Sequence, residues 1–331
     1  MDYDRLAEKS LRDEVLTREE MRSVLQAPDE NLPVLLQSAF RVRHHYFGKR
    51  VQIHVLMNAK SGLCPEDCHY CSQSSVSTAP IDKYPLLAKE KLIEGARRAK
   101  EAGAVRYCMV TSGRGSTARE IEEMVEVVRG IKDRVPISIC CSLGLLTEDK
   151  AKVLKEAGVD RVNHNLNTSR NRYADICKTH TYDDRLETVG NVKSAGLSTC
   201  CGGIMGIGED DEDLMELALS LRELDVESIP VNFLHPIPGT PLQGVNQLTP
   251  QRCLKGLCLF RFLNPTKEIR VAGGRELHLR SLQPLSLYPA NSIFVNGYLT
   301  TWGQESSDAH RMVEDLGFEI ETGDGPSARL G

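Results

Sequence analysis

Apolar positions along the chain follow two alternating periods. Short β-branched runs predict strands, and apolar residues spaced three and four apart predict amphipathic helices. The expected strands are Val51–Met57, Val105–Thr111, Ile137–Leu143, Arg161–Asn167, Leu197–Ile207, Ser228–Leu234, Glu268–Ala272 and Ser292–Tyr298. The expected helices between them are Leu87–Ala102, Ala118–Ile131, Glu148–Ala157, Asp184–Ala195, Asp211–Leu224 and Pro250–Phe262. Helix boundaries carry their usual signals, with Thr147 and Thr249–Pro250 at starts and Gly158 and Gly196 at ends.

Eight strands separated by helices predict an α/β fold, a (β/α)8 TIM-type barrel with an N-terminal helical extension. An open, doubly wound sheet is the alternative, but it requires a glycine-rich turn after the first strand, where this chain has cysteines. We expect one domain over residues 1–331. It divides into a helical cap at 1–46, with helical periodicity at Asp13–Gln26 and Leu32–Tyr46, the barrel at 47–318 and a flexible tail at 319–331.

Composition narrows the class of protein. The 331 residues carry a net charge of −5, which favours neither nucleic acid nor an anionic membrane surface as a partner. Apolar runs are too short to span a bilayer, and the acidic N-terminus lacks the apolar segment of a secretory signal. These features indicate a cytoplasmic protein, in which the 11 cysteines are metal ligands or buried apolar residues rather than disulfides.

Three cysteines follow the first predicted strand closely. Cys64, Cys68 and Cys71 have the spacing C-x3-C-x2-C, which lets a loop wrap a [4Fe–4S] cluster and leaves one of its four irons open. The loop would lie at the C-terminal face of the barrel, where barrel active sites occur. A zinc loop is the alternative, but zinc favours C-x2-C pairs and four ligands. His69 could be the fourth ligand, but it lies between two of the cysteines and would strain the loop.

A second group of metal-capable residues falls on the predicted strands. It comprises Cys108, one member of the pair Cys140/Cys141, one of the pair Cys200/Cys201, and Arg270. Only one of each adjacent pair can face the lumen, because strand side chains alternate. Single strand cysteines are usually small buried apolar residues, and that interpretation is kept for Cys177, Cys253 and Cys258.

Asparagines recur at every second position in the fourth predicted strand. Asn163, Asn165 and Asn167 would share one face. Buried amides need hydrogen-bond partners, so a row of them inside a barrel predicts ligand binding.

The cysteine loop is similar to that of the radical-SAM superfamily, and residues 35–318 resemble the biotin synthase family. The segments that carry the resemblance are Gly62–Ser75, Arg106–Met109, Cys141–Gly144, Asn163–Ser169, Cys200–Ile204, Ile229–Leu234, Gly239–Leu242, Arg270–Glu276 and Ala290–Phe294.

The resemblance implies S-adenosylmethionine at the open iron, with Tyr70, Asn165 and Asn167 beside it, although position 167 is often aspartate in the family. It implies a second, [2Fe–2S] cluster on Cys108, Cys141, Cys200 and Arg270, the catalytic set. It selects Cys141 over Cys140 and Cys200 over Cys201. It implies that Asn165, Asn232, Thr300 and Thr301 bind dethiobiotin.

The expected reaction is radical sulfur insertion into dethiobiotin, the last step of biotin synthesis. The expected partners are a flavodoxin- or ferredoxin-like electron donor and a second copy of the chain. The rivals are a mutase or hydrogenase-cofactor maturase of similar barrel, which lacks the full second ligand set, and an iron–sulfur sensor. A sensor would need a partner- or DNA-binding module, and the sequence contains no basic helix-turn-helix.

Overall fold

The strands close into a parallel barrel. The computed structural model describes residues 2–322. Its barrel strands are β1 (Arg50–Lys60), β2 (Arg106–Thr111), β3 (Ser138–Ser142), β4 (Arg161–Asn163), β5 (Ser198–Cys200), β6 (Gly203–Met205), β7 (Ser228–Phe233), β8 (Glu268–Val271) and β9 (Ser292–Val295). Each pairs in parallel with its neighbour, and β9 returns to β1. The predicted barrel is therefore confirmed, with β5 and β6 together forming its fifth strand.

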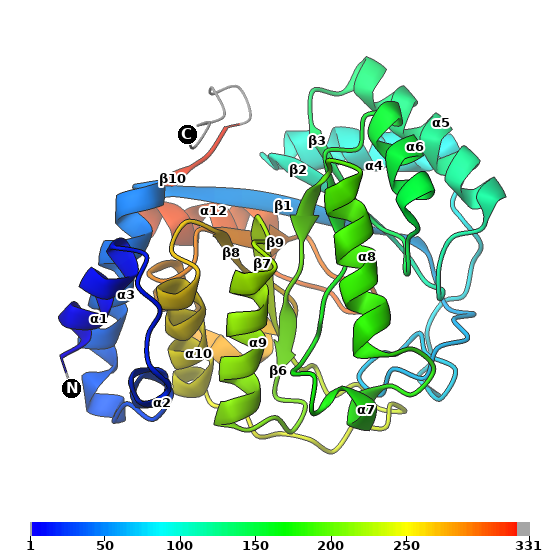
Figure 1. Cartoon of the computed structure of the whole chain (residues 1–331). Helices are drawn as coiled ribbons and strands as arrows, with labels where there is room; N and C mark the ends of the chain where they lie inside the picture. Colours follow the sequence, from blue (N-terminus) through cyan, green and yellow to red (C-terminus); the bar gives the residue numbers. More distant parts are fainter. Residues whose placement is uncertain (1, 323–331) are drawn as a thin grey trace.

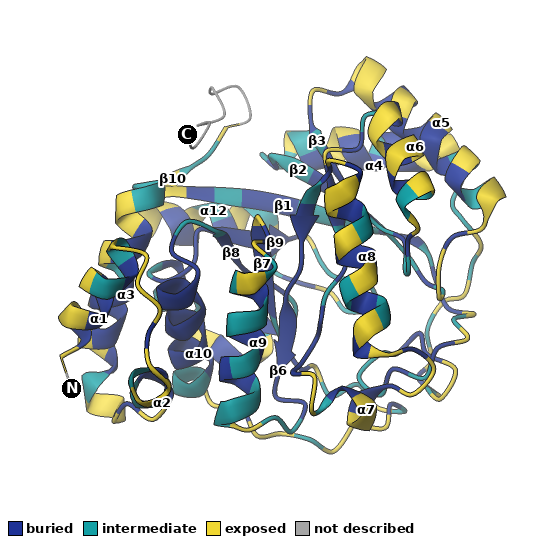
Figure 2. Cartoon of the chain, viewed as in Figure 1, coloured by how far each residue is buried: buried dark blue, intermediate teal, exposed yellow. Residues whose placement is uncertain are grey.

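Helices cover the outside of the barrel (Figure 1). They are α4 (Lys89–Glu101), α5 (Ala118–Arg134), α6 (Glu148–Ala157), α7 (Tyr173–Ile176), α8 (Tyr182–Ser194), α9 (Asp211–Glu223), α10 (Pro250–Leu263), α11 (Arg275–Leu279) and α12 (Ser306–Asp315). Most of them have a buried inner face and an exposed outer face, as amphipathic helices on a barrel require, whereas α10 is buried on both faces (Figure 2).

Several predicted boundaries agree with the local chemistry. The Thr249 side chain accepts a hydrogen bond from Arg252 N at the start of α10, and Gly158 ends α6 in a left-handed conformation at φ 107°. Thr147 occupies the N-cap position of α6 but makes no capping hydrogen bond through its side chain.

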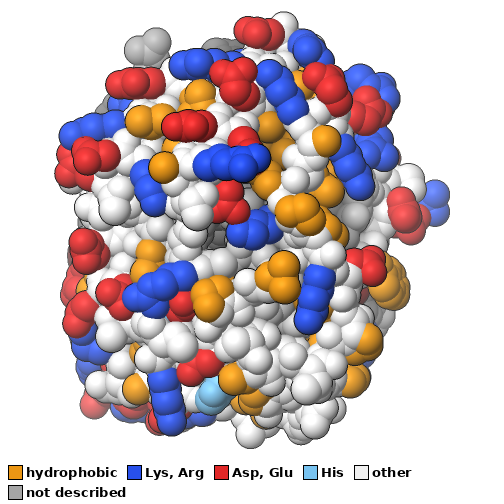
Figure 3. Space-filling view, turned by 90° about the vertical axis from the view of Figure 1, so that its right-hand side faces the viewer, with side chains coloured by type: hydrophobic (Ala, Val, Ile, Leu, Met, Phe, Trp, Pro, Cys, Tyr) orange, Lys and Arg blue, Asp and Glu red, His pale blue; other side chains and the backbone are white. Residues whose placement is uncertain are grey.

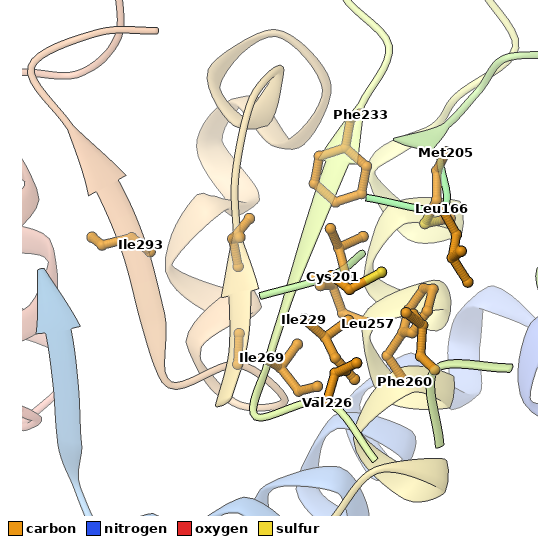
Figure 4. Packing of buried hydrophobic residues seen from close by; sticks show 14 of the residues in the cluster. Leu166, Cys201, Met205, Val226, Ile229, Phe233, Leu257, Phe260, Ile269 and Ile293 are labelled. Atoms are coloured by element: carbon orange, nitrogen blue, oxygen red, sulfur yellow. The ribbon is translucent and has the colours of Figure 1, made fainter. Parts of the chain in front are cut away.

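The N-terminal extension packs against α10. It consists of α1 (Tyr3–Leu11), α2 (Arg18–Leu25) and α3 (Leu32–Phe47), so the helix expected over Asp13–Gln26 begins only at Arg18. The Ser10 hydroxyl donates to the Phe262 carbonyl at 2.7 Å. Because these helices cover its outer side, α10 is buried along nearly its whole length. Figure 4 shows Leu257 and Phe260 of α10 packed against Cys201, Met205 and Ile229.

Two strands end several residues earlier than expected, and a third is interrupted. The fourth stops at Asn163 and the last at Val295, while Cys201 and Gly202 interrupt the fifth. A Cβ at Gly202 would lie 1.9 Å from the Pro230 carbonyl oxygen, so only glycine fits there.

The chain beyond the barrel returns to its edge. Glu319–Ile320 form β10, which pairs with the start of β1, so the tail predicted from residue 319 begins as a strand. Gly323, Gly325, Pro326 and Ser327 lie outside the described residues.

On the face seen in Figure 3, basic and acidic side chains are interspersed. Within residues 2–322, no helix is long and apolar enough to cross a membrane.

Candidate active site

One cavity of about 390 Å³ occupies the mouth and lumen of the barrel. Nearly all of the predicted site residues line it, although they come from six different parts of the chain. The predicted residues in its wall are Cys64, Cys68, Tyr70, Cys71, Cys108, Asn163, Asn165, Asn167, Asn232, Arg270, Thr300 and Thr301.

The loop after β1 places three thiols at the cavity mouth. Its backbone turns tightly, with Cys71 N donating to Cys68 O and Ser74 N donating to Cys71 O. Burial raises the pKa of Cys64 and raises that of Cys71 to about 11. A hydrogen bond with Cys177, together with burial, raises the pKa of Cys68. Thiols with a raised pKa stay protonated near neutral pH unless a bound metal cation displaces the proton, which fits a metal site at this loop.

Deeper in the lumen, the sheet register decides which cysteines meet. Cys140 is the Cα partner of Cys108, whereas Cys141 is the partner of Met109. Cys108 and Cys140 share a small buried cluster and line the cavity, while Cys141 packs into the main core outside the sheet. The prediction of Cys141 as the inward residue is wrong, because side chains on one pleat of adjacent parallel strands point the same way.

Cys200 and Arg270 complete this lower group. Arg270 Nη1 lies 3.7 Å from Cys200 Sγ, and Asn163 Nδ2 lies 3.3 Å from the same sulfur. Cys201 points outward into the packing against α10 (Figure 4). The structure therefore places Cys200, not Cys201, beside Arg270, as the sequence predicted.

Cys108 and Cys140 interact through their thiols. The hydrogen bond from Cys140, supported by Arg270 and Arg106, outweighs burial and lowers the pKa of Cys108. The same contact, together with burial, raises the pKa of Cys140. One thiolate is thus stabilised at the place where sulfur ligands converge.

A buried carboxylate, which sequence analysis missed, forms the floor of the lumen. Glu268 accepts from Arg161 Nη1 at 2.5 Å, from Ser292 Oγ at 2.8 Å and from the guanidinium of Arg270. His54 Nε2 lies 3.2 Å from Glu268 Oε1. Although burial alone would raise it, the pKa of Glu268 is held far below its ordinary range by Arg270 and Arg161.

This floor has an excess of positive charge. Arg106, Arg161 and Arg270 are all buried or nearly so around the single carboxylate of Glu268. Within the described chain, Arg270 Nε and Arg106 Nε have no hydrogen-bond partner. Unpaired buried donors are costly, so the floor fits an anionic, thiolate-ligated group above it.

The asparagines of the upper lumen are held by specific hydrogen bonds. Asn165 Oδ1 accepts from Asn163 Nδ2 at 3.0 Å and from Gly202 N at 3.1 Å, which leaves its amide nitrogen to face a ligand. Asn232 Oδ1 accepts from Gly273 N at 3.0 Å. Asn167, at φ 72°, lies beyond the end of β4, so strand alternation does not place it.

Two further predicted residues interact across the mouth. Asn167 Nδ2 donates to Tyr70 Oη at 2.7 Å, which orients the Tyr70 ring in the cavity wall. Thr300 Oγ1 shares a 2.7 Å hydrogen bond with Ser72 Oγ of the cysteine loop. The loop after β9 is thereby tied to the loop after β1.

Comparison with known proteins places this site in a family. Residues 60–221 match the model of the radical SAM superfamily, and residues 230–319 match the biotin and thiamin synthesis associated domain. The chain is 54% identical to biotin synthase of Bacillus subtilis (strain 168) over 317 residues, 96% of this chain and 95% of that protein. It is 55% identical to biotin synthase of Geobacillus kaustophilus (strain HTA426), over 98% and 97% of the two chains. The chain belongs to the biotin synthase family.

Solved structures show how widely the fold is shared. Methylornithine synthase superposes with a TM-score of 0.83 at 22% identity, covering 96% of this chain and 97% of that one. The FeFe-hydrogenase maturase of Carboxydothermus hydrogenoformans gives 0.81 at 18% identity, over 97% and 79%. These likenesses establish the barrel fold alone.

As a member of the biotin synthase family, the chain is a radical-SAM enzyme that inserts sulfur. It uses a [4Fe–4S] cluster with S-adenosylmethionine and an auxiliary [2Fe–2S] cluster. The donor sets fit both groups. Three thiols lie at the mouth, and Cys108 and Cys140 line the lumen, where Arg270 contacts the Cys200 thiol and has an unpaired Nε.

Proposed function

We propose that this cavity converts dethiobiotin to biotin, with Cys64, Cys68 and Cys71 holding the first cluster and Cys108, Cys140, Cys200 and Arg270 holding the second. The observation that carries the assignment is the convergence of Cys108, Cys140, Cys200 and Arg270 in one lumen beneath the three-cysteine loop. When bound, the first cluster supplies an electron to S-adenosylmethionine and the second supplies the sulfur that closes the ring.

The protein's own residues bind and orient the reactants between the two groups. Tyr70 and Asn167 offer S-adenosylmethionine an aromatic ring and an amide at the mouth. The amide nitrogen of Asn165 and the second N–H of the Asn232 amide, whose first donates to Gly203 O at 3.2 Å, offer a donor pair to the ureido oxygen of dethiobiotin. Thr300 and Thr301 offer hydroxyls to its carboxylate.

Arg270 gives the second cluster an unusual ligand. A guanidinium keeps its proton and is a poor metal ligand. Burial alone would lower the pKa of Arg270, but Glu268, Cys200 and Cys108 outweigh this effect and raise it, so the side chain stays charged. We infer that Arg270 holds this cluster weakly, so that it can give up a sulfide.

The partners follow from the chemistry. Electrons must reach the first cluster from a flavodoxin- or ferredoxin-like donor, which would dock near the exposed Leu63 of the cysteine loop. We propose the cytoplasm as the setting, where thiols remain reduced, and a homodimer as the assembly.

The test is anaerobic reconstitution with iron and 34S-labelled sulfide, followed by a single turnover with S-adenosylmethionine, dithionite and dethiobiotin. We expect 5′-deoxyadenosine together with biotin that contains the heavy isotope. Release of 5′-deoxyadenosine without biotin would keep the superfamily and reject the sulfur insertion. Unlabelled biotin would reject the second cluster as the sulfur source.

A further inference from the structure

Cys177 contacts the cysteine loop from behind. It follows α7, is buried, and places its Sγ 3.8 Å from Cys68 Sγ. Cys177 does not belong to the described residues that line the cavity. It therefore touches a proposed cluster ligand without facing the cluster site.

Backbone contacts fix this pair of sulfurs on both sides. His69 N donates to Ile176 O at 2.9 Å, directly beside the two cysteines. Asp67 Oδ1 accepts from the backbone N–H groups of Lys178 and Thr179 at 2.9 and 3.1 Å. Two loops that are more than 100 residues apart in the chain are thus joined where Cys68 and Cys177 meet.

The surroundings of Cys177 are polar, unlike those of an ordinary core cysteine. Its Sγ lies 3.1 Å from His180 Nδ1 and 3.2 Å from Asp67 Oδ1. By contrast, Cys253 and Cys258 are fully buried on α10 among aliphatic and aromatic side chains of the main core.

Cys177 also belongs to a compact group of potential ligand side chains around Cys68. In the described chain, Cys68, Cys177 and His180 form one group of potential metal ligands, whose ligand atoms all lie within 4.8 Å of one another. Neither Cys64 nor Cys71 belongs to it.

We propose that Cys177 is a resolving thiol for Cys68, so that a disulfide joins them when the first cluster has been lost and a peroxide is present. The proposal rests on the assignment of Cys68 as a cluster ligand. The disulfide would preserve Cys68 in a form that thiols can reduce, instead of letting it oxidise irreversibly to a sulfinic or sulfonic acid.

The chemistry balances with hydrogen peroxide as the oxidant. The Cys68 sulfur attacks peroxide, so that an S–O bond forms, the O–O bond breaks and one water leaves. The Cys177 sulfur then attacks the resulting sulfenic acid, so that the S–S bond forms, the S–O bond breaks and its proton leaves with a second water. The sulfurs must approach from 3.8 Å to about 2.05 Å, the length of a disulfide bond.

The test uses full-length, cluster-free, reduced protein treated with one equivalent of hydrogen peroxide, alkylated, digested and analysed by mass spectrometry. We expect a Cys68–Cys177 linked peptide as the main disulfide, and full recovery of iron binding after reduction and reconstitution. A disulfide between Cys68 and Cys64 or Cys71, or an unlinked Cys68, would overturn the proposal.

The variants Cys177→Ala and Cys177→Ser separate protection from folding, with Cys253→Ala as the matched buried control. Before peroxide, we expect all three to bind as much iron as the parent. After excess peroxide, which can carry an unprotected Cys68 sulfenic acid on to sulfinic acid, followed by reduction and reconstitution, we expect both Cys177 variants to recover about four irons per chain fewer than the parent, and Cys253→Ala to match the parent. Equal recovery in parent and Cys177 variants would overturn the proposal, as would low iron in both Cys177 variants before peroxide.

One further variant distinguishes this proposal from the assignment on which it rests. Cys68→Ala must lose the first cluster without any peroxide treatment. If Cys68→Ala kept that cluster, the ligand assignment would fail, whatever disulfide the parent forms.

Discussion

Replacing Glu268 with glutamine would test whether the floor of the barrel depends on its one carboxylate. The substitution keeps the size of the side chain but removes the carboxylate that Arg106, Arg161 and Arg270 share. Removing one partner from a buried charge network costs about 3–5 kcal/mol, because the remaining charges stay buried without compensation. We therefore expect Glu268→Gln to be among the most destabilising polar substitutions in the chain.

The expected shift can be measured by thermal unfolding of the cluster-free, reduced protein. At about 2.1 cal/mol/K per residue, 331 residues have an unfolding entropy of about 0.7 kcal/mol/K. A loss of about 3–5 kcal/mol then lowers Tm by about 4–7 °C.

Glu123→Gln is the matched control, because Glu123 pairs with Arg119 on the surface of α5. Such exposed pairs contribute about 0–1 kcal/mol, so we expect a shift of at most about 1.5 °C. If Glu268→Gln melted within the range of Glu123→Gln, the reasoning about a charge-balanced floor would be refuted.

Three further predictions concern pH, cluster release and substrate binding. Burial lowers the pKa of His54 to about 3. As the pH falls through about 6.5, His54 therefore binds a proton in the unfolded chain but not in the folded chain. The unfolding free energy should therefore fall between pH 7 and pH 5, by about 2 kcal/mol from this group, and His54→Gln should flatten the slope in pH-dependent melts. Arg270→Cys should hold the second cluster more tightly, seen as slower loss of its absorption during turnover; loss at the parent's rate contradicts a labilising role. Asn232→Ala should raise the KM for dethiobiotin by about tenfold, as expected for about 1.4 kcal/mol of lost hydrogen bonding, and leave that for S-adenosylmethionine unchanged. A change in both would contradict its assignment to one substrate.

The barrel could be predicted because its signals are local. Each strand is a short β-branched run and each helix has apolar residues on one face, so eight units were visible in the sequence. The ends of the strands were harder to predict, because they depend on residues that are distant in the chain. β4 stops at Asn163, the Cα partner of Cys200, and just beyond it Gly202 N donates to Asn165 Oδ1.

Which of Cys140 and Cys141 faces the lumen could not be predicted from the sequence. Both are buried, and adjacent strand residues differ only in the face they present, so a one-residue error in register exchanges them. The register of β3 against β2 settles the matter by pairing Cys140 with Cys108.

The charged floor was missed for a different reason. Arg106, Arg161 and Glu268 are far apart in the chain, and charged residues in strands are ordinarily exposed. One signal was available, because Glu268 stands two residues before Arg270 and must share its face of β8.

The most direct test of the site is the metal content of Cys140→Ala beside that of Cys141→Ala. The two positions are adjacent and equally buried, but only Cys140 faces the lumen. After anaerobic reconstitution, we predict about six irons per chain in Cys141→Ala and about four in Cys140→Ala, which keeps only the first cluster. The reverse pattern, or about six irons in both variants, would contradict the second cluster site described above.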